Sequence, residues 1–280
     1  MRSPVRGRTP AILLPGLDGS GRLFAPFLAA GPRAFEPETI SFPADRPLGY
    51  DALARLVRPR LPRGRFVLLA ESFSGPLAVR LAAERPRGLA ALVLAATFLR
   101  RPLGAVLGSV RGLVGARMFG LPMPGAMVRH LMAGLDAPGA MVEEVQRAVA
   151  AVAPEVLALR SAEALSVDVR AALAEVKVPV LFLAPTRDNL IRRDAHEDVR
   201  AARPDAEVAL LDAPHMVLQR SPHASLERIE GFLARVRASP ATPRRTRAGR
   251  SSPRASGGTR ARSRRRSPPP TAPSARRGRA

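Results

Sequence analysis

The 280-residue sequence has no cysteine and no tryptophan, and aromatic residues make up only 4% of it. Without thiols the chain can form neither disulfide bonds nor a cysteine-based active site. The absence of cysteine is compatible with the cytoplasmic location that we expect. No segment approaches the roughly 18–20 consecutive apolar residues of a membrane span. The first apolar stretch, 11–14, is far too short for the core of a signal peptide. These absences favour a globular protein without disulfides.

Lysine is also nearly missing, since 44 of the 45 basic residues are arginine and Lys177 is the exception. The formal net charge is +22, and residues 238–280 supply 13 of these charges because they hold 13 arginines and no acidic residue. This segment lacks any apolar periodicity, so we predict a disordered tail. Weak, nonspecific binding to a polyanion such as nucleic acid or an anionic membrane would suit its composition. An incidental extension explains the tail equally well.

Short apolar runs alternate with helical patterns through the rest of the chain, which predicts an α/β fold with a mostly parallel sheet and crossover helices. The alternation lapses from about 98 to 167, in a stretch rich in Gly, Pro and Met. There we predict a helical cap, inserted after the strand near 91–96, with one amphipathic helix at 141–152 that Pro154 ends.

The predicted organisation is an N-terminal extension (1–9), an α/β domain with its cap (10–237) and the tail. Strands are predicted at 11–14, 34–42, 66–70, 91–96, 178–184 and 207–211, and the remaining helices at 23–30, 50–61, 76–84, 167–175, 194–202 and 225–236.

Residues 67–79, Val-Leu-Leu-Ala-Glu-Ser-Phe-Ser-Gly-Pro-Leu-Ala-Val, hold the most informative pattern. A buried strand stops at Glu71 and a helical pattern begins after Ser72, so Ser72 lies on a sharp strand-to-helix turn. A serine at such a corner points its hydroxyl away from the sheet, beside the N–H groups of the first helical turn. Ala70 and Ser74 are the small residues on either side, which makes the pattern a relaxed form of G-x-S-x-G.

Three other segments each follow a predicted strand: Leu-Pro-Gly-Leu-Asp-Gly-Ser-Gly at 14–21, Ala-Pro-Thr-Arg-Asp-Asn-Leu-Ile at 184–191 and Asp-Ala-Pro-His-Met-Val-Leu-Gln at 212–219. With the Ser72 corner, they resemble the α/β-hydrolase family in order, spacing and strand context. The resemblance covers roughly residues 10–236 and implies a capped, serine esterase- or lipase-like member.

The chemistry explains why these residues would meet. A serine hydroxyl is a poor nucleophile at neutral pH, so a base must take its proton, and the imidazole of His215 has a suitable pKa. A carboxylate must then orient the imidazole and stabilise it when it is charged. Asp188 is our choice because it follows a predicted strand, where catalytic loops gather in open α/β sheets. The chain order Ser, Asp, His is that of the family.

The resemblance also assigns the oxyanion hole to the backbone N–H groups of Leu17 and Phe73. We expect no cofactor and no metal ion, since the sequence has no cysteine and no histidine pair at helical spacing with an acidic residue. Two departures from the family pattern are that Pro15 stands where many members have histidine and that serine and alanine replace both glycines of the corner motif.

Each of these residues also has a simpler explanation. Ser72 alone would suit a helix N-cap, Ser74 is a nearby rival nucleophile, and Asp188 before an asparagine is typical of a turn. The other nearby acids, which we expect on a solvated surface or too close to the histidine in sequence, are Asp194, Glu197, Asp198 and Asp212. The other histidines, expected at surface or capping positions, are His130, His196 and His223.

Methionines crowd the predicted cap, at positions 118, 123, 127, 132 and 141. They suit ordinary packing and an apolar roof over a substrate chain equally well. We therefore predict a hydrolase that cleaves a small carboxylic ester with an apolar acyl or alcohol part through an acyl-enzyme. The alternatives are a thioesterase, a C–C hydrolase or an acyltransferase with the same triad, and a non-catalytic binding protein tethered to nucleic acid or membrane by the tail.

Overall fold

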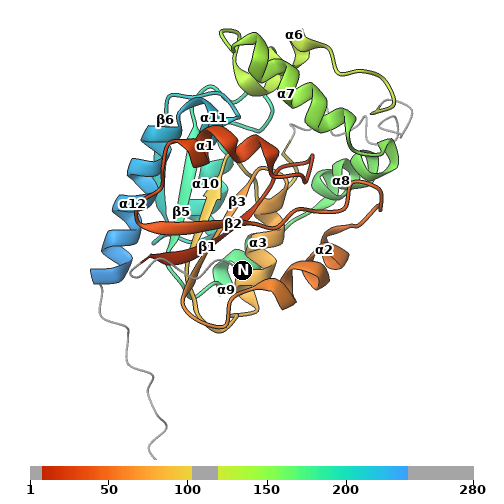
Figure 1. Ribbon diagram of the computed structural model, residues 1–280. Helices are drawn as coiled ribbons and strands as arrows, with labels where there is room; N and C mark the ends of the chain where they lie inside the picture. Colours follow the sequence, from red (N-terminus) through yellow and green to blue (C-terminus); the bar gives the residue numbers. More distant parts are fainter. Residues whose placement is uncertain (1–7, 103–118, 239–280) are drawn as a thin grey trace, which may run out of the picture. The chain divides into compact units, whose positions relative to one another are not determined.

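A computed structural model describes residues 8–102 and 119–238. The predictions for residues 1–7, for Met118 with the rest of 103–118, and for the tail from 239 onwards lie outside these ranges. The described chain forms one sheet with helices on both faces (Figure 1).

The sheet has six parallel strands in the order β2-β1-β3-β4-β5-β6. Leu13, Leu69, Val93 and Leu181 lie side by side across its four central strands. The strand order reverses between β1 and β3, and such a switch point leaves a crevice at the carboxyl ends of the strands. The strands are β1 (Thr9–Leu14), β2 (Phe35–Thr39), β3 (Phe66–Glu71), β4 (Leu89–Ala95), β5 (Val180–Pro185) and β6 (Glu207–Leu211).

Alternate strand residues face two separate apolar cores, because successive side chains of a strand point to opposite faces. Leu13 and Leu69 pack on one face with α1 (Ala25–Ala29), α11 (Val217–Arg220) and α12 (Pro222–Ala238). Leu14 and Leu68 pack on the other face, against α2 (Tyr50–Val57), α3 (Ser74–Ala83), α9 (Arg170–Glu175) and α10 (Ala195–Ala202). Short 3-10 turns, η1 (Arg22–Phe24) and η2 (Arg58–Arg60), adjoin α1 and α2. Both faces of the parallel sheet are therefore covered, as the sequence predicts.

Further helices are inserted between β4 and β5. We call the described residues 119–175 the insertion. It contains α6 (Gly125–Met127), the π-helical turn η4 (Val128–Ala133), α7 (Gly139–Ala150), α8 (Pro154–Ser166) and α9.

The expectation of a single good helix before residue 167 was wrong. Pro154 does not merely end a helix, because it is the first residue of the 13-residue α8. Proline suits a first helical position, since its fixed φ is helical and the N–H that it lacks would have no partner there.

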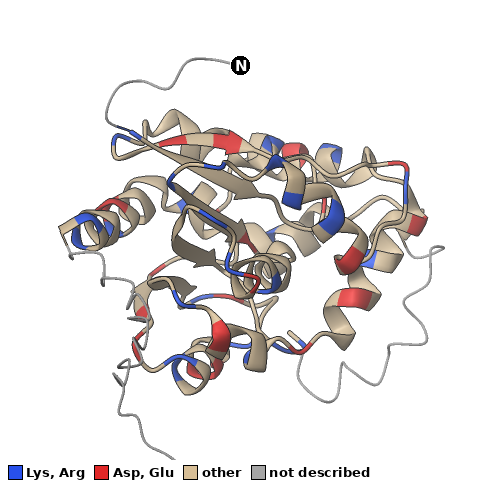
Figure 2. Cartoon of the chain, turned by 90° about the horizontal axis from the view of Figure 1, so that it is seen from below, with Lys and Arg blue, Asp and Glu red and all other residues tan. Residues whose placement is uncertain are grey.

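Charged residues of both signs are interspersed over the described elements (Figure 2). Many form exposed ion pairs, such as Arg58 with Glu84 at 2.7 Å, and such pairs contribute little individually. Within residues 8–102 and 119–238, no helix is long and apolar enough to span a membrane.

Candidate active site

Ser72 occupies the corner between β3 and α3 with a φ of +51°, a left-handed conformation that is uncommon for a residue with a side chain. Two neighbours hold it there. The Ser72 N–H donates to the Ala95 carbonyl over 3.0 Å, and the Thr97 hydroxyl donates to the Ser72 carbonyl. The end of β4 therefore fixes the strained corner, which places the Ser72 side chain on the wall of a cavity.

The corner also depends on Gly75, which the sequence analysis did not single out. A Cβ at this position would lie 1.9 Å from the Thr97 hydroxyl oxygen, so only glycine fits without movement. The signal was present as a glycine three residues after the serine.

Ser74 is fully buried, and its hydroxyl donates to the carbonyl of Pro15. Two departures from the family pattern, Pro15 and Ser74, thus contact each other. This hydrogen bond joins the Ser72 corner to the glycine-rich loop after β1. The Ser74 hydroxyl therefore has a structural role.

His215 lies between Ser72 and Asp188. Its Nε2 is 2.9 Å from the Ser72 Oγ, and its Nδ1 is 2.8 Å from an oxygen of Asp188. The other Asp188 oxygen accepts hydrogen bonds from the N–H groups of Leu190 and Ile191, at 2.8 and 2.9 Å. His215 and Asp188 are only 3% and 4% exposed. The loops after β3, β5 and β6 therefore bring the three predicted residues into one hydrogen-bonded chain.

A second buried carboxyl group lies beside this chain. Glu71 accepts hydrogen bonds from the Gln219 amide at 2.9 and 3.2 Å. Burial raises the pKa of Glu71 to about 7, although the Gln219 hydrogen bond and His215 act in the opposite direction. Sequence reasoning missed both residues, since a glutamate at the end of a strand carries no signal of its burial.

Opposing effects act on His215. Burial is the largest, and it lowers the pKa of the imidazole. Attraction to Asp188, the hydrogen bond to it and the nearby Glu71 together outweigh burial, so the His215 pKa is raised above its ordinary value. These carboxylates favour the imidazolium form.

The glycine-rich loop after β1 lies directly beside the Ser72 corner, since a Cβ at Gly16 would lie 3.9 Å from the Ser72 Cβ. The Gly19 N–H donates to the Gly16 carbonyl over 3.0 Å, which closes a tight turn around Leu17. Among the described residues, neither the Leu17 N–H nor the Phe73 N–H has an acceptor. Leu17 and Phe73 both line the cavity, so two unused donors are available at the site.

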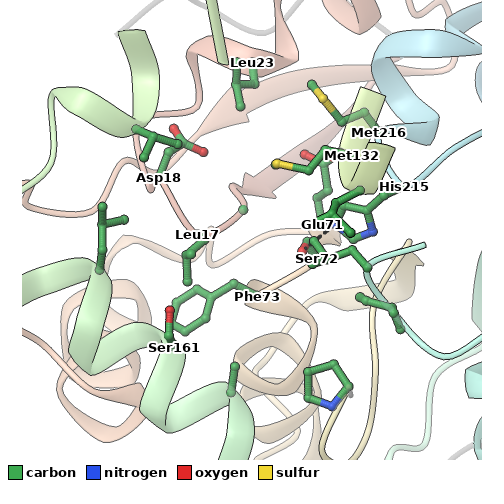
Figure 3. A pocket seen from close by; sticks show the side chains of 18 of the residues that line it. Leu17, Asp18, Leu23, Glu71, Ser72, Phe73, Met132, Ser161, His215 and Met216 are labelled. Atoms are coloured by element: carbon green, nitrogen blue, oxygen red, sulfur yellow. Dashed lines mark hydrogen bonds between the residues drawn. The ribbon is translucent and has the colours of Figure 1, made fainter. Parts of the chain in front are cut away.

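The cavity has a volume of about 360 Å³ and lies between the carboxyl ends of the strands and the insertion. Figure 3 shows Ser72, Glu71 and His215 grouped together, with Met132 and Met216 beside them. Met123 and Met127 also line the cavity. Most of the remaining lining is aliphatic or aromatic: Leu17, Leu23, Phe73, Phe98, Phe119, Leu131, Val149, Leu157, Ala164, Leu165, Leu190 and Ile191.

Met141, the last of the described cap methionines, does not line the cavity and packs with Val128 and Val142 in an apolar cluster beside it. Met123 and Met132 pack against the same cluster and also line the cavity, so the two roles that the sequence left open are shared by the same side chains.

The rival residues lie elsewhere. Asp212 pairs with Arg187 at 2.7 Å, and Asp194 pairs with Arg192 at 2.5 Å. None of the other three histidines lines the cavity. Within the described residues, no group of three or more His, Asp or Glu side chains is arranged to hold a metal ion.

Comparison with known proteins agrees with this architecture. Residues 11–228 match the sequence profile of the Alpha/beta hydrolase family. The chain belongs to this family. The predicted family and the predicted fold, a parallel sheet with crossover and insertion helices, are therefore confirmed. No curated protein sequence matches this α/β-hydrolase.

Solved structures share its fold at low sequence identity. The enol-lactonase from Burkholderia xenovorans LB400 is 19% identical with a TM-score of 0.71, over 81% of this chain and 92% of that chain. A thermophilic esterase from Thermogutta terrifontis is 20% identical with a TM-score of 0.66, over 81% and 90% of the two chains. An esterase from Rhodococcus sp. ECU1013 is 18% identical with a TM-score of 0.67, over 82% and 91%. At these identities the likeness shows a shared fold.

Proposed function

We propose that this α/β-hydrolase cleaves carboxylic esters through an acyl-enzyme intermediate, with Ser72 as nucleophile. The observation that carries the proposal is the hydrogen-bonded chain from Ser72 through His215 to Asp188 at the wall of an apolar cavity. Several proteins of the same fold are described as esterases, which is consistent with this chemistry.

In the first half of the reaction, the Ser72 Oγ attacks the ester carbonyl while His215 Nε2 accepts its proton. Asp188 holds Nδ1 protonated and stabilises the imidazolium that forms. The tetrahedral intermediate then breaks its bond to the alkoxy oxygen, His215 returns the proton to that oxygen, and an alcohol leaves. The acyl group remains bonded to Ser72.

In the second half, His215 deprotonates a water molecule that attacks the acyl carbonyl. The bond to the Ser72 Oγ breaks, the serine recovers its proton, and a carboxylic acid is released. The Leu17 and Phe73 N–H groups, which have no acceptor within the described chain, would donate to the oxyanion in both halves. The reaction needs no cofactor.

The cavity favours an uncharged substrate with an apolar acyl or alcohol part. Its described lining includes the carboxyl groups of Asp18 and Glu71 and no arginine or lysine. A free carboxylate on the substrate would lose its hydration without gaining a cationic partner among these residues. A volume of about 360 Å³ is at the lower end of the range for small-molecule sites.

The test combines covalent labelling with hydrolysis. A fluorophosphonate probe should label the wild-type protein and the Ser166→Ala variant, whose serine is exposed on α8. Labelling should disappear in Ser72→Ala. Labelling that persists in the folded Ser72→Ala protein would refute the assignment of the nucleophile.

A substrate panel then tests the reaction itself. It contains p-nitrophenyl esters of graded acyl length, matched thioesters, an ester with a terminal carboxylate, and an added alcohol acceptor. We expect hydrolysis of the neutral esters, lost in Ser72→Ala, and little with the anionic ester. Turnover of thioesters alone, or transfer to the alcohol in preference to water, would replace esterase by one of the other activities of this triad.

A further inference from the structure

Arg160 is the largest fully buried side chain of the described residues, with 0% exposure. It lies on α8 of the insertion and does not line the cavity. A buried charge is costly unless it is paired, yet Arg160 forms no ion pair with any described carboxylate. Its Nε is buried without a hydrogen-bond partner. A charge kept under these conditions needs a structural explanation.

The guanidinium group is directed at backbone carbonyls. Nη1 donates to the Leu17 carbonyl and Nη2 donates to the Pro43 carbonyl, each over 2.8 Å. The group also lies 5.7 Å from the centre of the Phe42 ring, within the range of a cation–π interaction. One side chain of the insertion thus holds two separate loops, after β1 and after β2.

The loop after β1 is shaped around this side chain. Gly19 has a φ of +72°, and a Cβ there would lie 2.6 Å from Arg160 Nη1. Gly19 itself is tied at both ends, since its N–H donates to Gly16 and its carbonyl accepts from the Phe42 N–H over 2.8 Å. The guanidinium group therefore packs directly against the turn that contains the Leu17 N–H.

Electrostatics are consistent with a cation at this position. Burial lowers the pKa of Arg160 to about 10, while the carboxylate of Asp18 acts in the opposite direction. The side chain therefore remains charged at neutral pH, and it donates charge-assisted hydrogen bonds, which are stronger than neutral ones.

We propose that Arg160 is a positioning residue for the oxyanion hole: by holding the Leu17 carbonyl, it fixes the turn that aims the Leu17 N–H into the cavity. The inference deepens the proposed function and rests on it. It makes α8 of the insertion part of the machinery that stabilises the transition state, although Arg160 touches no reacting atom.

The expected effect is a change in kcat with little change in KM, because the oxyanion donors act mainly on the transition state. Loss of one such donor costs roughly 100- to 1,000-fold in kcat. Arg160→Ala misplaces a donor without removing it, so we expect kcat to fall by about 10- to 100-fold. KM should stay within about threefold of the wild-type value.

The matched control is Arg203→Ala. Arg203 is also mostly buried and donates to two backbone carbonyls, those of Val176 and Val178, but it lies after α10 and does not line the cavity. Its removal should leave kcat unchanged. Added guanidinium ion, at concentrations that do not denature the protein, should restore kcat in Arg160→Ala by occupying the vacated space. It should not restore kcat in Arg160→Met, because the longer side chain fills that space.

These measurements separate positioning from general destabilisation. A normal kcat in Arg160→Ala, an equal loss in Arg203→Ala, or a folded Arg160→Ala protein that guanidinium ion does not restore would each overturn the proposal. If the wild type hydrolyses no ester, the proposed function fails separately. Amide hydrogen exchange at Gly19 then decides the role of Arg160, since exchange should accelerate in Arg160→Ala and slow again with guanidinium ion, and an unchanged rate would refute it.

Discussion

Replacement of Glu71 by glutamine should stabilise the protein at neutral pH and have less effect at low pH. Glu71 is 7% exposed, and burial raises its pKa from 4.5 to about 7. Glutamine has nearly the same shape, and its amide oxygen can still accept the hydrogen bond from Gln219. The substitution therefore removes the ionisation with little change in packing.

The sign follows from proton binding. Between pH 4.5 and pH 7 the folded protein keeps Glu71 protonated while the unfolded chain releases the proton. The folded state binds more protons, so the contribution of Glu71 to the free energy of unfolding is complete below pH 4.5 and is lost as the pH rises towards 7. Each pKa unit corresponds to about 1.4 kcal/mol, so the shift amounts to about 3 kcal/mol.

Urea denaturation of the wild type and Glu71→Gln, measured at intervals from pH 4.5 to pH 8, tests this expectation. The free energy of unfolding of the variant should gain about 3 kcal/mol relative to the wild type across this range, with an unchanged denaturant slope. Glu227→Gln, an exposed change on α12, is the control and should follow the wild type. A difference between Glu71→Gln and the wild type that does not vary with pH would refute the argument.

Three further predictions concern the same corner of the fold. The acidic limb of the pH–kcat profile should move to lower pH in Glu71→Gln, because Glu71 ionises near pH 7 and then helps to raise the pKa of His215, whereas glutamine carries no charge, and an unmoved limb would contradict the coupling. Ser74→Ala should lower the free energy of unfolding by about 1–3 kcal/mol, measured by urea denaturation, because it leaves a buried carbonyl of the glycine-rich loop without its donor. Gly75→Ala should lower it by more than about 2 kcal/mol, since the new Cβ meets a threonine oxygen at 1.9 Å. Gly139→Ala should change it little, because no described atom beyond its neighbours and its own helix lies within 4 Å of the new Cβ.

The fold was predictable because its signals are local and repeated. Each central strand is a short apolar run ending at a polar or glycine-rich segment, and a parallel sheet brings all those ends to one edge. That is why residues as distant as Ser72 and His215 could be placed together from sequence. Their hydrogen bond of 2.9 Å agrees with the expected proximity, while their catalytic role stays a prediction.

The groups that sequence reasoning missed depend on contacts between segments far apart in the chain. Arg160 is one arginine among 44, and the pattern of α8 does not reveal that its guanidinium group reaches the Leu17 carbonyl. Glu71 is similar, because its raised pKa comes from burial beside Gln219, which is 148 residues away. Periodicity records which face of an element is apolar, and it does not record which polar group is enclosed when two elements pack.

The departures from the family motif also involve contacts between segments far apart in the chain. These contacts explain how the corner tolerates the departures. Ser74 stands where the motif has glycine, and its hydroxyl donates a hydrogen bond to the carbonyl of Pro15. Pro15 in turn stands where many members have histidine. The requirement for glycine is met one residue later, at Gly75, where a Cβ would collide with Thr97. The Leu17 turn is then held from two sides, by Ser74 through Pro15 and by Arg160 through the Leu17 carbonyl. If both contacts position the same N–H, the kcat losses of Ser74→Ala and Arg160→Ala should not add independently in the double variant.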